Sequence, residues 1–349
     1  SGITTVTGAV SVNGNNYPSR GFFSYRNLVV NGAMEVAQRG TSQSNANPAI
    51  GSVDRMRFAL SGGTGTMSQQ TMSASDRSTT GFDKYLRLDL SAGNNNAGLY
   101  YNVEAADILH AQGKKLTLSF WAKGTNPAGG SFVVPHYWYD GSNQDDGASE
   151  SLTITSSWAK YAITFDTATA SSVSLTSVNA RYDIAILQPN ADTSTNAWQL
   201  DITGLMLEVG SQASPFEYEN ITTTLSKCQR YYAKIEGPVH GYACWSYSNV
   251  TSTHFSLPEK MRTVPSVTFT GTNNTGTNDA VTNDTFSLYN HNTWLGTSSG
   301  NGTQYGGTSA SSTQSIRINT YPHSSFTSNG ISVGLYFGQN CSINADAEF

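Results

Sequence analysis

The sequence predicts an all-β protein, in which a β-sandwich is followed by a second, smaller β-sandwich, with one or two short helices. Only 12% of the residues are charged, against roughly a quarter in ordinary globular proteins, and Ser, Thr, Asn and Gly fill many polar positions. Short runs of alternating apolar and polar residues recur along the chain, each bounded by turn-forming residues. Because 349 residues exceed the usual size of one compact β-domain, we expect two domains.

The first domain is predicted to cover residues 26–221. In LTLSFWAKG, Phe120 and Trp121 are adjacent and face opposite sides of a strand, so one of them must point away from the core or into an interface. The alternating runs have the spacing of strands in two packed antiparallel sheets. They are KYLRLDL, KKLTLSFWAKG, GSFVVPHYWYD, ESLTITS, AKYAITFD, SVSLTSV, RYDIAILQP and AWQLDITGLMLEVG.

Helical spacing occurs in two places. In VEAADILHAQG, the apolar side chains of Val103, Ile108 and Leu109 fall on one side, and a glycine can end the helix. In TTTLSKCQRYYAKI, residues 222–235, the threonines at 222–224 supply N-cap oxygens. We expect this second helix to be a short joint between the domains.

Residues 1–25 form an N-terminal leader with few large apolar side chains, which is either frayed or an arm that joins a neighbouring subunit. Residues 236–349 are predicted to form the second domain. Its strand-like runs are GYACWSYS, THFSLP, SVTFTG, TFSLYN, QSIRINTYP, ISVGLYFG and CSINADAEF. The intervening stretches GTNNTGTNDAVTND and GTSSGNGTQYGGTSASS lack apolar anchors, so we expect them to be loops.

Several classes of protein are disfavoured by the composition. The formal net charge is -5 and no Lys/Arg cluster occurs, which argues against nucleic acid as a partner. No apolar run approaches the roughly 18 residues of a membrane span, so no membrane insertion is expected. Three cysteines, Cys228, Cys244 and Cys341, are too few for a disulfide framework and fit assembly in a reducing cytoplasm.

Five separated segments resemble a family of bacteriophage tail-fibre and related virion proteins. The first is NLVVNGAMEVAQRG (27–40), followed by DRMRF (54–58), in which Met56 replaces the family's aromatic residue. The others are LTLSFWAKG (116–124), LDITGLMLEVGSQASPFEYEN (200–220), LSKCQRYYAKI (225–235) and the ending ADAEF, which is similar to the family's ADAEL.

The resemblance implies a jelly-roll domain similar to carbohydrate-binding modules, fused to a further β-domain at the distal end of a homotrimeric fibre. It also implies a location in the virion, on a phage tail assembled in the cytoplasm of the bacterial host. The leader would contact other tail or virion proteins. The resemblance names no receptor.

An acidic cluster in YDGSNQDDGASE contains Asp140, Asp145, Asp146 and Glu150. A solvated turn is the first interpretation, because glycine and asparagine surround these carboxylates. A structural calcium site on Asp140, Asp145 and Asp146 is the second, although the D-x-D-x-D-G spacing is missing. Catalysis by a carboxylate pair is the third. No other cofactor is expected, because the six histidines lack metal-ligand spacing and no nucleotide-binding fingerprint occurs.

Aromatic side chains beside polar groups are candidates for ligand binding, because the C–H faces of sugars stack on aromatic rings. In the run Tyr137, Trp138 and Tyr139, successive rings face opposite sides of the strand. Core packing explains the rings on one side, and those on the other side are candidates for ligand binding. For each single aromatic residue, packing is the competing interpretation. The second-domain candidates are Trp245, Tyr247, Trp294 and Tyr305.

The function expected is that of a non-enzymatic virion structural and receptor-binding protein, the tip of a phage tail fibre, which recognises a host cell-surface glycan or envelope component. Recognition is expected in the second domain, with Trp294 and Tyr305 first, because its long polar loops face solvent. The Tyr137–Tyr139 run of the first domain is the competing site. The alternatives are an architectural tail or capsid-decorating component, a polysaccharide depolymerase, and a secreted bacterial carbohydrate-binding module.

Overall fold

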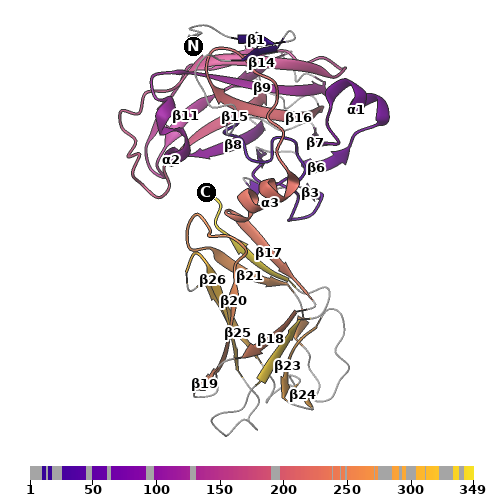
Figure 1. The fold of residues 1–349 in the computed structure, drawn as a ribbon, viewed down its shortest axis with the longest axis vertical. Coiled ribbons are helices and arrows are strands. Elements are labelled where there is room, and N and C mark those ends of the chain that lie inside the picture. The colour runs from indigo at the N-terminus through magenta and orange to yellow at the C-terminus, as the bar shows by residue number, and fades with distance from the viewer. Residues whose placement is uncertain are drawn as a thin grey trace, which may run out of the picture. The chain divides into compact units, whose positions relative to one another are not determined.

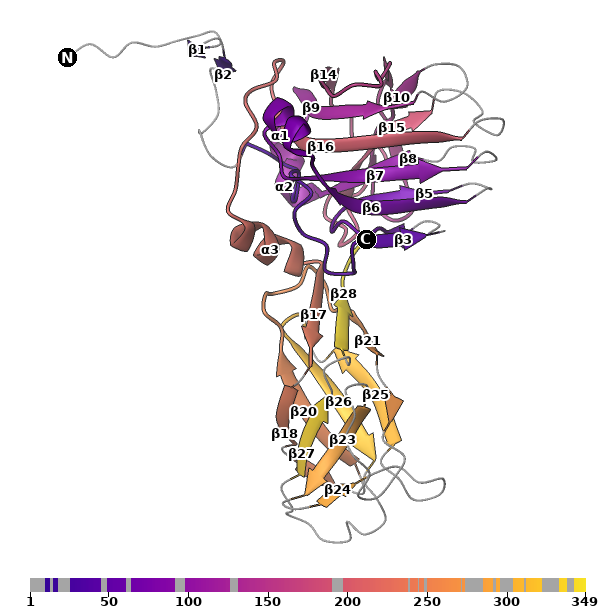
Figure 2. The same cartoon turned by 90° about the vertical axis from the view of Figure 1, so that its right-hand side faces the viewer.

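A computed structural model describes the chain in segments, and the chain folds as two compact units, Ser1–Cys228 with Phe349, and Gln229–Glu348 (Figures 1 and 2). This division falls inside the segment predicted as the joint. The residues described are 10–12, 15–17, 26–44, 49–60, 64–91, 98–125, 131–189, 197–237, 239–243, 245–247, 250–270, 272–273, 285–290, 293–295, 304–310, 312–321, 333–337 and 342–349.

The first unit is a β-sandwich of two antiparallel sheets (Figure 2). The eight-stranded sheet has the order β12-β11-β15-β8-β5-β4, with β10 also paired to β15 and β13 paired to β10. Its strands are β4 (Ala49–Ile50), β5 (Arg57–Ala59), β8 (Gly98–Glu104), β10 (Phe132–Val134), β11 (His136–Tyr139), β12 (Gln144–Asp146), β13 (Glu150–Leu152) and β15 (Arg181–Pro189).

The six-stranded sheet has the order β14-β9-β16-β7-β6-β3. Its strands are β3 (Ser42–Ser44), β6 (Gly65–Thr71), β7 (Lys84–Leu90), β9 (Lys115–Gly124), β14 (Ala159–Asp166) and β16 (Trp198–Val209). A separate hairpin, β1 (Val10–Val12) with β2 (Asn15–Tyr17), lies in the leader, whose other residues are outside the described part.

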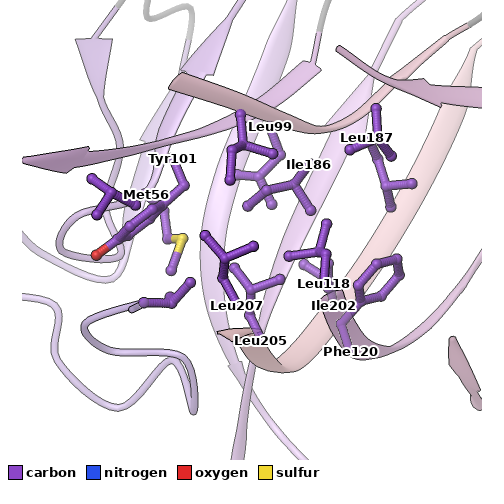
Figure 3. Close-up of a cluster of buried hydrophobic side chains, with 14 of the residues drawn as sticks. Met56, Leu99, Tyr101, Leu118, Phe120, Ile186, Leu187, Ile202, Leu205 and Leu207 are labelled. Carbon is purple, nitrogen blue, oxygen red and sulfur yellow. The ribbon is translucent and has the colours of Figure 1, made fainter. Parts of the chain in front are cut away.

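The core lies between the two sheets, and strand alternation supplies it. Every second side chain of a half-buried strand points inward. Figure 3 shows side chains of β9 and β16 facing side chains of β8 and β15. As expected, one residue of the adjacent pair in β9 is completely buried, Phe120, while Trp121 points to the other side and is only partly buried. The all-β architecture, a jelly-roll sandwich followed by a smaller β-sandwich, is therefore confirmed.

One predicted strand of the first unit is wrong. The run SVSLTSV, residues 172–178, forms bends and turns, although its valines and leucine alternate with polar residues. Its backbone N–H groups at Val173 and Ser174 donate to the carboxylates of Asp145 and Asp140, not to a neighbouring strand. The alternation of apolar and polar residues within one run does not show that carboxylates from another segment bond the backbone N–H groups that a strand would use for pairing.

The helices differ from the predictions. Among the described residues there are three α-helices, α1 (Ala74–Thr80), α2 (Ala105–Ile108) and α3 (Ile221–Gln229), with a 3-10 turn directly after α2. Leu109 lies in this turn and is 42% exposed, so the predicted apolar side of the helix is wrong at this residue. Helix α3 is capped by Asn220, whose side chain accepts from the N–H of Thr222, and not by the threonines.

The incoming and outgoing segments of the first unit, residues 26–28 and 214–217, are bonded together. The carboxylate of Glu217 accepts hydrogen bonds from the backbone N–H groups of Arg26 and Asn27, at 2.7 and 2.9 Å. The Arg26 guanidinium also donates to the hydroxyl of Ser214 over 2.7 Å. The family-like segments at 27–40 and 200–220 therefore have a clear structural role where the chain enters and leaves the sandwich.

The second unit consists of three described sheets, ordered β17-β28-β21, β18-β27-β23-β22 with β24 beside β23, and β19-β20-β26-β25. Their strands are β17 (Tyr232–Glu236), β18 (Val239–Ala243), β19 (Trp245–Tyr247), β20 (Val250–Ser256), β21 (Ser266–Thr270), β22 (Thr272–Asn273), β23 (Thr285–Asn290), β24 (Thr293–Leu295), β25 (Gln304–Ala310), β26 (Ser315–Tyr321), β27 (Val333–Phe337) and β28 (Ser342–Asp346). Strand β25 lies within a stretch that we predicted to be a loop, so that prediction is wrong there. Its backbone pairs with β26 although it has few apolar side chains.

Candidate functional site

The outer face of the eight-stranded sheet brings together aromatic and charged side chains from four strands. In β11 the His136 and Trp138 side chains point into the core, so Tyr137 and Tyr139 point outward. Tyr137 pairs in register with Asp183 of β15, and Asp183 pairs with Asn102 of β8. We call the group Arg57, Tyr100, Asn102, Tyr137, Tyr139, Arg181 and Asp183 the tyrosine face.

Trp138 is not part of a binding site, and its prediction as a ligand-binding residue is wrong. Its side chain is completely buried. The indole Nε1–H donates to the carbonyl of Ala168 over 2.8 Å, and the ring packs edge-on against Tyr182 with a centroid distance of 4.9 Å. Packing therefore explains the inward side of the run, as the competing interpretation held, and the outward side carries the two tyrosines.

A buried ion pair lies at the centre of the tyrosine face. Asp183 is only 2% exposed, and Nε of Arg181 donates to both of its carboxylate oxygens, at 2.8 and 3.0 Å. The amide of Asn102 donates to the same carboxylate over 2.5 Å. Burial raises the pKa of Asp183, and the Arg181 guanidinium opposes this rise. The network is bonded before any ligand arrives, so its groups are held in fixed positions.

Three partly buried tyrosines surround this network. Burial, and to a lesser extent the charge of Asp183, raises the pKa of Tyr137 to about 12. Burial also raises the pKa of Tyr100. The guanidinium carbon of Arg181 lies 4.5 Å from the centroid of the Tyr139 ring. With raised pKa values, Tyr100 and Tyr137 keep their hydroxyl protons at neutral pH, so these two hydroxyls can donate and accept hydrogen bonds beside an aromatic surface.

Sequence reasoning found Tyr137 and Tyr139 but missed the rest of the tyrosine face. A signal was present in RYDIAILQP, where Asp183 interrupts an apolar strand. A buried carboxylate must be paired, so that position alone suggests a charged partner nearby. Which strands lie beside β15, and hence that Asn102 and Tyr100 belong to the group, depends on long-range strand order that alternation does not encode.

The acidic cluster is a carboxylate-capped loop and does not fit a calcium site. Asp145 accepts hydrogen bonds from the N–H and hydroxyl groups of Ser171 and Ser172, at 2.7 to 2.8 Å. These bonds, led by the N–H of Ser172, hold the pKa of Asp145 well below its usual range. The N–H groups of Asn143, Ser174 and Ser142 do the same for Asp140.

A cation would have to compete with these donors for the same oxygens. Asp146 accepts from Gln144 over 2.6 Å, and its carboxylate does not join the other two. Within the described segments, no group of three acidic, histidine or cysteine side chains is arranged to hold a metal ion. The arrangement is the turn of the first interpretation, with its carboxylates used as N–H acceptors.

The second-unit candidates stay predictions. The backbones of Trp245 and Tyr247 lie in β19, that of Trp294 in β24 and that of Tyr305 in β25. Trp294 pairs with Tyr289, and Tyr305 pairs with Thr320. The side chains of all four candidates lie outside the described part of the chain.

A separate cavity of about 330 Å³ lies between residues 27–33 and the segment 216–227. Glu217 in its wall is bonded to the incoming backbone, and Glu219 accepts from Lys227 and from the Thr224 hydroxyl. The bonds of these carboxylates hold the chain together at this point. No helix among the described residues is long and apolar enough to span a membrane.

No protein-family model and no curated protein sequence matches the chain. Among similar solved structures, the family 11 carbohydrate-binding module of the cellulase Lic26A-Cel5E of Clostridium thermocellum is 12% identical, with a TM-score of 0.30, over 49% of this chain and 97% of the module. TmCBM61, solved in complex with beta-1,4-galactotriose, is 13% identical, with a TM-score of 0.28, over 53% of this chain and 99% of that chain.

The enzymatically active domain of tailspike protein 4 of bacteriophage CBA120 is 13% identical, with a TM-score of 0.33. That match covers 56% of this chain and only 24% of the tailspike chain. At these TM-scores none of the three likenesses assigns the chain to a family. The architecture described above rests on the strand pairing of the chain itself.

Proposed function

We propose that this chain is a non-enzymatic receptor-binding and structural protein of a phage-like particle, and that it binds a glycan of the host cell surface through the tyrosine face. The observation that carries the proposal is the set of outward-facing tyrosines around the bonded Asn102–Asp183–Arg181 network. The family-like segments of the sequence support the assignment to a virion.

The tyrosine face has the two properties that sugar recognition needs. Aromatic rings offer an apolar surface to the C–H face of a sugar, and hydroxyl, amide and charged groups beside them bond its hydroxyls. Asn102 and Asp183 are buried and hydrogen-bonded to each other, so they fix the strands that carry the tyrosines, and little conformational freedom is lost when a ligand binds. Tyr137 is placed centrally, because it is the register partner of Asp183.

Assembly would strengthen weak single sites. We propose a homotrimer, in which the leader joins other tail or virion proteins and no cofactor takes part. Three linked sites facing one cell surface bind far more tightly than one site. A modest affinity of each tyrosine face is therefore sufficient for attachment.

The test compares variants of the full chain for binding to host cells and to a glycan array. Losing one stacked ring costs about 1 kcal/mol or somewhat more, so Tyr137→Ala should weaken binding by a single site about tenfold. Tyr218→Ala is the matched control, because Tyr218 is 64% exposed and lies outside the tyrosine face. Unchanged binding by a folded Tyr137→Ala protein would contradict the proposed site.

A further variant separates the two units. Trp294→Ala tests the sequence prediction that recognition lies in the second unit. If Trp294→Ala abolishes binding while Tyr137→Ala does not, the glycan site is in the second unit. Incubation of the protein with the bound polysaccharide, followed by an assay for new reducing ends, tests the non-enzymatic part of the proposal.

A further inference from the structure

Arg57 is the one cation of the tyrosine face that lacks a hydrogen-bonded or ion-paired partner among the described residues. It begins β5, and its neighbour Phe58 is completely buried in the core, so the Arg57 side chain points to the outer face. It is only partly buried there. Tyr100 is its register partner on β8.

The other charged side chains on or beside the tyrosine face have bonding partners or pair in register with residues other than Arg57. Arg181 is bonded to Asp183, and the buried Arg55 donates to the backbone carbonyl of Asn102. In the described part of this sheet, the register places two further acidic residues, Glu104 and Asp146, on the same side. They are the register partners of Arg181 and Tyr137, whereas the register partner of Arg57 is a tyrosine.

The charge of Arg57 acts at the centre of the tyrosine face. It favours the ionised forms of Tyr100, Tyr137 and Asp183, and so opposes the effect of burial on the pKa of each. Its place on the sheet agrees with this, because Arg57 pairs in register with Tyr100 and points to the same outer face. A guanidinium carries a planar fork of N–H donors, which matches the oxygens of a carboxylate or a phosphate.

We propose that Arg57 is a specificity-determining residue, and that the glycan bound by the tyrosine face carries an oxyanion substituent, either a uronate carboxylate or a phosphate. The charged sugar would lie against Tyr100 and Tyr137 with its anionic group on the Arg57 fork. This inference rests on the proposed function and adds the chemical class of the ligand.

The experiment uses the full chain and an array of matched sugars. Glucuronate is compared with glucose, galacturonate with galactose, and mannose 6-phosphate with mannose. Hydrogen bonds to charged groups discriminate by about 10- to 100-fold, so the wild-type protein should prefer the charged member of at least one pair by this factor. The pair that shows the preference identifies the oxyanion.

Arg57→Gln should remove that preference while leaving the affinity for the neutral sugar unchanged. Arg57→Lys should retain part of it, because lysine keeps the charge and loses the fork. Arg77→Gln is the control, since it removes an equal charge from a side chain that is 52% exposed and paired with Asp83. Thermal unfolding of each variant checks that the fold is kept.

Three results would overturn the inference. The first is equal wild-type binding to both members of every pair, and the second is a charge preference that survives in Arg57→Gln. The third is an equal loss for charged and neutral sugars, which would give Arg57 a structural role. The proposed function still stands in all three cases if Tyr137→Ala weakens binding, whereas unchanged binding by Tyr137→Ala contradicts both proposals.

Discussion

The hydroxyl of Tyr182 satisfies two polar groups inside the sandwich, so Tyr182→Phe should be strongly destabilising. The N–H of Ala168 donates to this oxygen over 3.1 Å, and the oxygen lies 2.6 Å from Nδ1 of His136. Nε2 of His136 lies 2.8 Å from the carbonyl of Ala148, so Nε2 carries the ring proton and Nδ1 accepts the proton of the hydroxyl.

The size of the effect follows from these contacts. Phenylalanine keeps the ring that packs against Trp138, so the substitution opens almost no cavity. It leaves the N–H of Ala168 and Nδ1 of His136 without a partner, and each unsatisfied buried group costs about 1–3 kcal/mol. We therefore expect the free energy of unfolding of the first unit to fall by about 2–6 kcal/mol.

Urea denaturation followed by tryptophan fluorescence measures this change. Tyr218→Phe is the matched control, because its hydroxyl donates to the carbonyl of Gly81 at an exposed site where water can replace it. The control should change the stability by less than about 0.5 kcal/mol. A loss below about 1 kcal/mol in Tyr182→Phe would refute the assignment of the hydroxyl as the partner of both groups.

Three further predictions concern the same part of the first unit. Burial lowers the pKa of His136 below its ordinary value of 6.5. As the pH falls, the unfolded chain therefore takes up a proton before the folded chain does, and the free energy of unfolding should decrease below about pH 6.5. His136→Gln should flatten this dependence in unfolding measured from pH 8 to 5. Asp145→Asn should speed amide hydrogen exchange at Ser171 and Ser172, because it removes the carboxylate that accepts from their N–H groups. The pKa of Asp145 is lowered, so lowering the pH should have the same effect only below the ordinary carboxyl pKa of 3.8. Gly147→Ala would place a methyl carbon 1.9 Å from Cε1 of His136, and thermal unfolding should show a loss of about 1–3 kcal/mol.

Strands could be predicted from the sequence where the residues of a single run determine the structure of that run. The runs KYLRLDL and AKYAITFD coincide with β7 and β14, because alternation fixes both the strand and its buried face. The run RYDIAILQP coincides with β15 as a short, mostly apolar run that is buried on both faces. Helix α1 was missed although its signals are local: Ser73 caps the N–H of Asp76, and Gly81 ends the helix at a φ of 82°. Its residues carry no apolar side, so a search for periodicity passed over it.

The structure of a segment could not be predicted from its own residues where its backbone bonds to groups far away in the sequence. The run at 172–178 alternates like a strand, yet the carboxylates of Asp140 and Asp145 take its N–H groups. The opposite happens at β25, where the pairing strand β26 orders a segment poor in apolar residues. The tyrosine face follows the same rule, because Arg57, Tyr100 and Asp183 meet only through the order of the strands.

The bonds between the incoming and outgoing segments have a mechanical consequence. A pulling force on the chain enters the first unit near Arg26 and leaves it after Glu217, and the carboxylate of Glu217 joins these two points directly. Arg26 adds a second link to Ser214, and the N–H of Leu28 donates to the carbonyl of Leu207 over 2.8 Å. These hydrogen bonds between residues 26–28 and 207–217 therefore carry the tension before it reaches the strand pairing within either sheet. Under tension applied at Arg26 and Glu217, these bonds must therefore break before the strands that carry the tyrosine face are pulled apart.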